Sequence, residues 1–165
     1  MNSNHSQKKI LERNAIDLFI DRFYNIFGAK FRIIELRERP DALLETERGK
    51  KIGIEIAHLF RNQDEARYLL RKQDNIDFVF EDLNVVEDYI VALNYILKKK
   101  EKVIGKYKVD YPVSLLIRSS TPDLSYEKMK LMESRLYIPN NCNHIWILLD
   151  DSMMDQRWTN LVKIK

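Results

Sequence analysis

Apolar residues near the start of the chain recur every three or four positions, the spacing of one helix face. This pattern predicts a helix from Gln7 to Phe27, which Gly28 ends. The apolar stripe consists of Ile16, Phe19, Ile20, Phe23 and Phe27. Glu12 lies on the same stripe, so we expect its carboxylate to be paired, at the edge of the core, or in a cleft. The alternative is a first-turn acid that favours the helix dipole.

From residue 31 onward the pattern changes to alternation with a period of two, which predicts β-strands. Three strands are expected in succession: Phe31 to Glu38, Asp41 to Thr46, and Lys51 to Leu59. Pro40 separates the first two, because the residue before a proline is pushed toward extended geometry. Residues 31–60 therefore predict a three-stranded meander that carries Asp41 and Glu55.

The turn between the second and third strands decides which residues face each other. A three-residue loop ending at Gly49 is favoured, because such loops usually end with a glycine in the left-handed region. Thr46 would then pair with Lys50, and Asp41 would lie opposite Glu55 on the same face of the sheet. A two-residue loop would shift the pairing by one residue and place Asp41 on the other face.

The rest of the chain predicts further helices and buried strands. Asn62 fits an N-cap for a helix that runs to about Asp82. A second long helix covers about Val85 to Ile104, and its lysine-rich end is interpreted as solvated. An apolar strand from Tyr111 to Arg118 is typical of a strand covered on both sides. The remaining elements are a loop with a short helix over 122–136, a strand over 144–150 and a last strand over 158–165.

Composition bounds the class of protein. A chain of 165 residues with 45% apolar residues fits one domain spanning residues 1–165. The net charge of +3 is compatible with a polyanionic partner without requiring one. Cys142 is the single cysteine, so no internal disulfide is possible and a reducing, cytoplasmic location is expected. No signal peptide and no membrane-spanning stretch are expected.

The predicted order of elements is a helix, three meandering strands, helices and a buried strand. With Pro40-Asp41 at the start of the second strand and Glu55-Ile56-Ala57 in the third, the chain resembles the PD-(D/E)XK nuclease superfamily. The resemblance covers residues 7 to about 118. It implies an α/β fold with a restriction-endonuclease-like αβββαβ core, here with an extra long helix and additional C-terminal strands.

The resemblance also implies a metal-dependent nuclease that hydrolyses phosphodiester bonds in DNA. Asp41, Glu55 and the main-chain carbonyl of Ile56 would bind Mg²⁺ (or Mn²⁺), and Glu12 would reach the same site through water. These oxygens are a sufficient protein share of the coordination shell, because Mg²⁺ prefers oxygen ligands and keeps several waters. The metal would activate a water and stabilise the charge that develops on the phosphodiester.

Ala57 departs from the family pattern, because it stands where the family has a lysine two residues after the acid. Alanine can neither position a water nor offset charge. Either a neighbouring side chain fills this space, with Gln63, Arg67 and Arg71 as candidates on the following helix, or the domain has lost catalysis and only binds.

Three alternatives stay open. Asp41 and Glu55 could be salt-bridge partners, since Arg37, Arg39 and Lys51 are near in sequence. The protein could also be a non-catalytic nuclease-like domain that binds nucleic acid or a protein partner, or an assembly protein whose aromatic faces pair two subunits as a homodimer.

Overall fold

The computed structural model describes residues 3–60, 86–119, 121, 123–149 and 161–165. In this part of the chain the protein is a mixed α/β domain with three α-helices and one six-stranded open sheet. The elements are α1 (Ser3–Phe27), β1 (Phe31–Leu36), β2 (Ala42–Thr46), β3 (Lys51–Leu59), α3 (Val86–Ile104), β4 (Val113–Ser119), α4 (Tyr126–Met132), the 3₁₀ helix η1 (Glu133–Arg135), β5 (Ile145–Leu148) and β6 (Leu161–Lys163).

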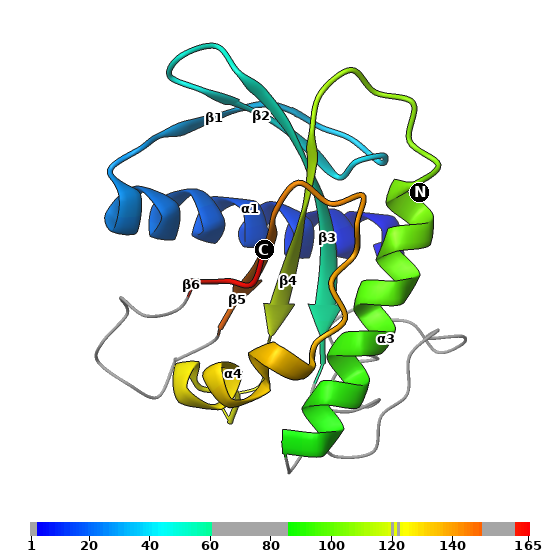
Figure 1. Ribbon diagram of the computed structural model, residues 1–165. Helices are drawn as coiled ribbons and strands as arrows, with labels where there is room; N and C mark the ends of the chain where they lie inside the picture. The colour runs from blue at the N-terminus through cyan, green and yellow to red at the C-terminus, as the bar shows by residue number, and fades with distance from the viewer. Residues whose placement is uncertain (1–2, 61–85, 120, 122, 150–160) are drawn as a thin grey trace.

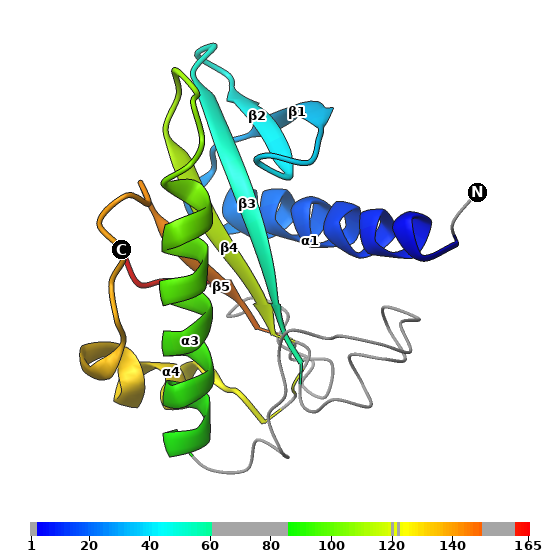
Figure 2. The same ribbon diagram turned by 90° about the vertical axis from the view of Figure 1, so that its right-hand side faces the viewer.

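The strands lie in the order in which they occur along the chain, β1 to β6. The first three pair antiparallel, β3, β4 and β5 pair parallel, and β6 returns antiparallel beside β5. Helix α1 covers one face of this sheet, while α3 and α4 lie on the other (Figures 1 and 2). The sheet is therefore the middle layer, and β4 in its interior is buried on both faces as predicted.

Each face of the sheet has its own apolar core. On the α1 side, Ile16 and Phe19 pack with Leu44, Ile54 and Ile56. On the α3 side, the larger core is built from the stripe of α3 and from alternate residues of β3, β4 and β5. The alternation predicted for residues 52–56 is confirmed, because one set of side chains reaches each layer.

The hairpin between β2 and β3 has the predicted three-residue loop. The amide of Thr46 donates to the carbonyl of Lys50 at 2.9 Å, and Gly49 has a φ of 75°. The ladder then pairs Glu45 with Lys51 and ends with Ala42 beside Ile54. Continued by one residue, this register places Asp41 opposite Glu55, so the three-residue alternative is the one adopted.

Several predicted boundaries were wrong by a few residues. The first helix begins at Ser3 and not at Gln7, and β1 ends at Leu36 and not at Glu38. The second strand begins at Ala42, so Asp41 directly precedes it. The helix predicted from Asn62 lies outside the described residues. No helix in the described part is long and apolar enough to cross a membrane.

Gly53 lets the segment before β2 lie directly against β3. A β-carbon added at Gly53 would lie 2.7 Å from Cγ of Pro40 and 2.9 Å from a ring carbon of Tyr111. Both distances are shorter than a van der Waals contact, so no larger residue fits without movement. The absence of a side chain at position 53 therefore sets how closely Pro40 and Asp41 approach the middle strand.

We predict that Gly53→Ala lowers the free energy of unfolding by about 1–3 kcal/mol, the usual cost of overpacking. Urea-induced unfolding followed by circular dichroism measures this change. Gly28→Ala is the control, because a β-carbon there meets no atom within 4 Å and only its φ of 67° adds strain. A Gly53→Ala protein as stable as the wild type would contradict the close approach of Pro40.

Candidate functional site

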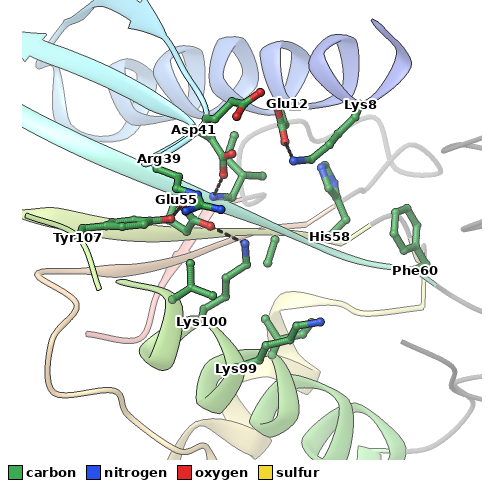
Figure 3. Close-up of a pocket in the computed structure, with 15 residues that line it drawn as sticks. Lys8, Glu12, Arg39, Asp41, Glu55, His58, Phe60, Lys99, Lys100 and Tyr107 are labelled. Carbon is green, nitrogen blue, oxygen red and sulfur yellow. Dashed lines mark hydrogen bonds and ion pairs between the residues drawn. The ribbon is translucent and has the colours of Figure 1, made fainter. Parts of the chain in front are cut away.

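A cavity of about 320 Å³ opens between α1, the second half of β3 and α3 (Figure 3). Helix α1 contributes Lys8 and Glu12, and the loop before β2 contributes Arg39 and Asp41. The same loop contributes Glu38. The other walls come from β3 and the residue after it, from α3 and from the connection that follows α3. They comprise Glu55, Ile56, Ala57, His58, Phe60, Ile96, Lys99, Lys100, Val103 and Tyr107.

Asp41 is held at the point where β2 leaves β3. Its side chain is buried, and Oδ2 accepts a 2.7 Å hydrogen bond from the amide of Ile56. The amide and carbonyl of one residue point to the same side of a strand. The carbonyl of Ile56 therefore also points toward the side of Asp41, as a main-chain ligand would require.

Glu55 lies on the α3 side of the same strand and is also buried. Its Oε1 accepts a 2.6 Å hydrogen bond from Nζ of Lys100, and its Oε2 accepts one of 2.5 Å from the hydroxyl of Tyr107. Figure 3 shows Lys100 reaching up from α3 to this carboxylate. The ammonium group of Lys100 thus lies beside Glu55, and Ala57 lines the same cavity.

The structure corrects the interpretation of the lysine-rich end of α3. Lys98, Lys99 and Lys102 are exposed as expected, but the Lys100 side chain is only 21% exposed and pairs with Glu55. Lys100 continues the buried stripe of α3, following Leu97 by three residues. That spacing is the sequence signal that separates it from its neighbours.

The expected salt-bridge partners are not the ones observed. Arg37 contacts Glu35 at 3.7 Å and the hydroxyl of Tyr111, and Lys51 is exposed on the far half of β3. Glu55 does form an ion pair, but with a lysine more than 40 positions away in the sequence. The charge on Glu55 is therefore balanced from α3 and not from the meander.

Glu12 lies in the middle of α1 and not in its first turn, so the helix-dipole alternative is wrong. Its side chain is 13% exposed, lines the cavity and pairs with Nζ of Lys8 at 3.1 Å. Burial lowers the pKa of Lys8, but the charges of Glu12, Asp41 and Glu55 outweigh burial and hold that pKa above its usual value. Glu12, Asp41 and Glu55, the three acids predicted from the sequence, therefore line one cavity and all stabilise the charge of Lys8.

Burial raises the pKa of Asp41 to about 7, and the negative charges of Glu55 and Glu12 add to the effect. The hydrogen bond from Ile56 and the charge of Lys100 oppose the shift without cancelling it. Burial and the hydrogen bond to Glu55 likewise raise the pKa of Tyr107, which stays a hydrogen-bond donor. At Asp41, burial and the two neighbouring acids therefore outweigh the hydrogen bond from Ile56 and the charge of Lys100.

These donors fit a hard divalent cation. Asp41 and Glu55 supply carboxylate oxygens and Ile56 supplies a carbonyl. Burial is the main cause of the raised pKa of Asp41, and a dication would relieve the second cause, which is repulsion from Glu55 and Glu12. Among the described residues no group of three or more His, Cys, Asp or Glu lies close enough to hold a metal by itself.

His58 and Phe60 form the end of the cavity beyond the acids. Their rings stack with centroids 5.7 Å apart and planes inclined by 24°. Burial, then the positive charges of Arg118, Lys100 and Lys8, lower the pKa of His58 to about 3. His58 therefore lies in the cavity wall as a neutral imidazole.

Sequence reasoning brought Glu12, Asp41, Glu55 and Ile56 to one place and missed others. Lys8, Lys100 and Tyr107 line the same cavity and were not candidates. Tyr107 lies in the connection after α3 and carries no sequence signal for its contact with Glu55. The proposed substitutes for the missing lysine, Gln63, Arg67 and Arg71, lie outside the described residues.

Comparison of the chain with protein-family models, with curated proteins and with solved structures found no match. The resemblance to the PD-(D/E)XK superfamily therefore rests on the order of the elements and on Asp41, Glu55 and Glu12 alone.

The raised pKa of Asp41 predicts how stability depends on pH. A carboxyl whose pKa is about 7 when folded and 3.8 when unfolded destabilises the folded state as pH rises from about 4 to about 7. Asp41→Asn removes this titration. We predict that the variant gains stability relative to the wild type across this range in metal-free buffer, measured as the difference in free energy of unfolding by urea.

Asp17→Asn is the matched control, because Asp17 lies on the exposed face of α1 and pairs with Arg13. Its stability relative to the wild type should stay nearly constant over the same pH range. An Asp41→Asn protein that loses stability equally at every pH would contradict a strained, buried carboxylate at position 41.

Proposed function

We propose that this protein is a metal-dependent nuclease of the PD-(D/E)XK type, which hydrolyses phosphodiester bonds in DNA. Asp41, Glu55 and the carbonyl of Ile56 would hold Mg²⁺ or Mn²⁺, and Glu12 would assist through water. Lys100, reaching the site from α3, would supply the positive charge that Ala57 cannot.

The observation that carries the proposal is the contact between Lys100 and Glu55 beside Ala57. A lone acidic pair in a hairpin is common, and so is a surface lysine. Here a 2.6 Å ion pair forms inside a cavity and supplies the missing charge next to two buried carboxylates. Burying Asp41 with its pKa raised to about 7 costs stability, and such perturbed carboxyl groups are typical of functional sites.

The arrangement of elements agrees with the proposal. The described order of α1, three antiparallel strands, α3 and the parallel strand β4 is that of an αβββαβ core. The positions of the acids support the proposal, because Asp41 directly precedes β2, Glu55 lies within β3 and Glu12 lies on α1.

The chain's own residues would position the reacting groups. The amide of Ile56 fixes one oxygen of Asp41, while Tyr107 and Lys100 fix both oxygens of Glu55. When bound, the metal would activate a water and offset charge on the phosphodiester. The ammonium of Lys100 would stabilise the negative charge that builds up on the phosphate, from a site where little water competes.

A nucleic-acid-binding domain without catalysis is the second candidate. It is favoured by one observation: both oxygens of Glu55 already accept short hydrogen bonds from Lys100 and Tyr107. A carboxylate satisfied in this way has less need of a metal ion. The two candidates differ in whether DNA is cleaved, which is directly measurable.

We predict that Asp41→Ala and Glu55→Ala each abolish cleavage of labelled DNA in Mg²⁺ or Mn²⁺. The loss of a ligand to the metal removes both the activated water and the charge stabilisation, so rates should fall by about 100-fold or more. Gel analysis of linear, circular and single-stranded DNA measures the rates. Circular dichroism checks that each variant is folded.

Asp17→Ala serves as the control, since this exposed acid lies on the opposite face of α1 and should leave the rate unchanged. Wild-type protein that leaves DNA and RNA intact with either metal would overturn the nuclease proposal. Binding of DNA that survives Glu55→Ala, in the absence of cleavage, would favour the second candidate.

Lys100→Ala should lower the cleavage rate by about 100-fold while leaving the affinity for the metal unchanged or higher, because the ammonium no longer competes for Glu55. Single-turnover kinetics and a titration of Mn²⁺ separate the two effects. Lys102→Ala, on the exposed side of the same helix, should behave as the wild type. Equal rates in the Lys100→Ala and Lys102→Ala proteins would remove Lys100 from the proposed site.

A further inference from the structure

The size of the cavity restricts what can reach the two buried acids. Asp41 and Glu55 are only 6% and 4% exposed, and the cavity above them measures about 320 Å³. That volume is at the small end of the range for ligand pockets. It is too small to enclose a double helix. A nucleotide that enters the cavity, so that its phosphodiester lies beside Asp41, would therefore be unpaired.

The cavity has an ionic end and an aromatic end. Asp41, Glu55 and Tyr107 define the ionic end, while Phe60 lies at the opposite side in Figure 3. A nucleotide has the same division, with a charged phosphate at one end and a flat, polarisable base at the other. The two ends of the cavity therefore match the two parts of one nucleotide.

The aromatic end is a stacked pair. The rings of His58 and Phe60 lie nearly parallel, and Phe60 remains partly exposed at the end of β3. Within the described part of the chain, Nε2 of His58 is buried without a hydrogen-bond partner. His58 thus supports Phe60 as a second flat ring.

We propose that Phe60, backed by His58, is a stacking platform for the base of an unpaired nucleotide, so that the substrate is single-stranded DNA or a frayed strand end. The inference rests on the proposed function, because it places the adjoining phosphate at Asp41 and Glu55. Base stacking on aromatic side chains tolerates any sequence, since every base has a π-face.

The charges along the walls agree with a strand backbone that passes through the cavity. Lys8, Arg39 and Lys99 line it together with Lys100, and they come from three separate elements. Cations on both sides of the acids can contact the phosphates that flank the stacked nucleotide. The platform selects an unpaired base, and these cations hold the strand.

The test measures binding in EDTA, where no cleavage occurs, by fluorescence anisotropy of labelled DNA. Wild-type protein should bind a single-stranded oligonucleotide at least 10-fold more tightly than the blunt duplex of the same sequence. Phe60→Leu keeps the apolar volume but removes the ring, and should weaken single-strand binding about 10-fold. Phe60→Trp should retain the affinity, and the added tryptophan fluorescence should be quenched by bound DNA.

Phe27→Ala is the control, because this 53%-exposed phenylalanine lies nineteen residues, or about 28 Å of helix, from Lys8 at the cavity. It should leave binding unchanged. Equal affinity for duplex and single strand, or a Phe60→Leu protein that binds as the wild type does, would overturn the platform. Because binding is read without metal, failure of cleavage in the Asp41 and Glu55 experiments stays a separate result.

Discussion

The hydrogen bond from the amide of Ile56 to the carboxylate of Asp41 is the contact on which the site depends. It forms where the β2–β3 ladder has ended, so a side chain takes the place of the next backbone partner. Beyond this point β3 has no neighbour among the described residues on that edge, and the cavity opens there. The same bond fixes Asp41 and leaves the carbonyl of Ile56 directed to the same side.

Within the described part of the chain, two of the acids in the cavity, Glu55 and Glu12, are paired with a lysine, and Asp41 is not. Glu55 is neutralised by Lys100, and Glu12 by Lys8, each from a helix on a different face of the sheet. Among the described residues Asp41 accepts a hydrogen bond from an amide and contacts no cation, and its pKa is raised to about 7 by burial and by the neighbouring acids. A cation from outside would therefore gain most by binding at Asp41, next to oxygens whose orientation is already fixed.

Local patterns were enough to predict the meander and its register. Gly49 fixed the loop length, and the alternation of residues 52–56 fixed the faces, because both depend on neighbours only a few positions away. The partner of Glu55 was not predicted, since Lys100 comes from a helix 45 positions later in the sequence. The sequence does place Lys100 on the buried stripe of α3. It does not show that this stripe faces β3, because that depends on how α3 packs on the sheet.

The position of His58 shows what strand alternation alone does not predict about the cavity. Alternation places His58 on the α1 face and Ala57 on the α3 face, and only one of them could line a cavity confined to one face. The cavity instead wraps around the open edge of β3, so residues from both faces reach it, from Lys8 on α1 to Lys100 on α3. An edge that the sheet leaves open gives the two layers of the fold a common space, and the acids, the lysine and the aromatic pair meet in it.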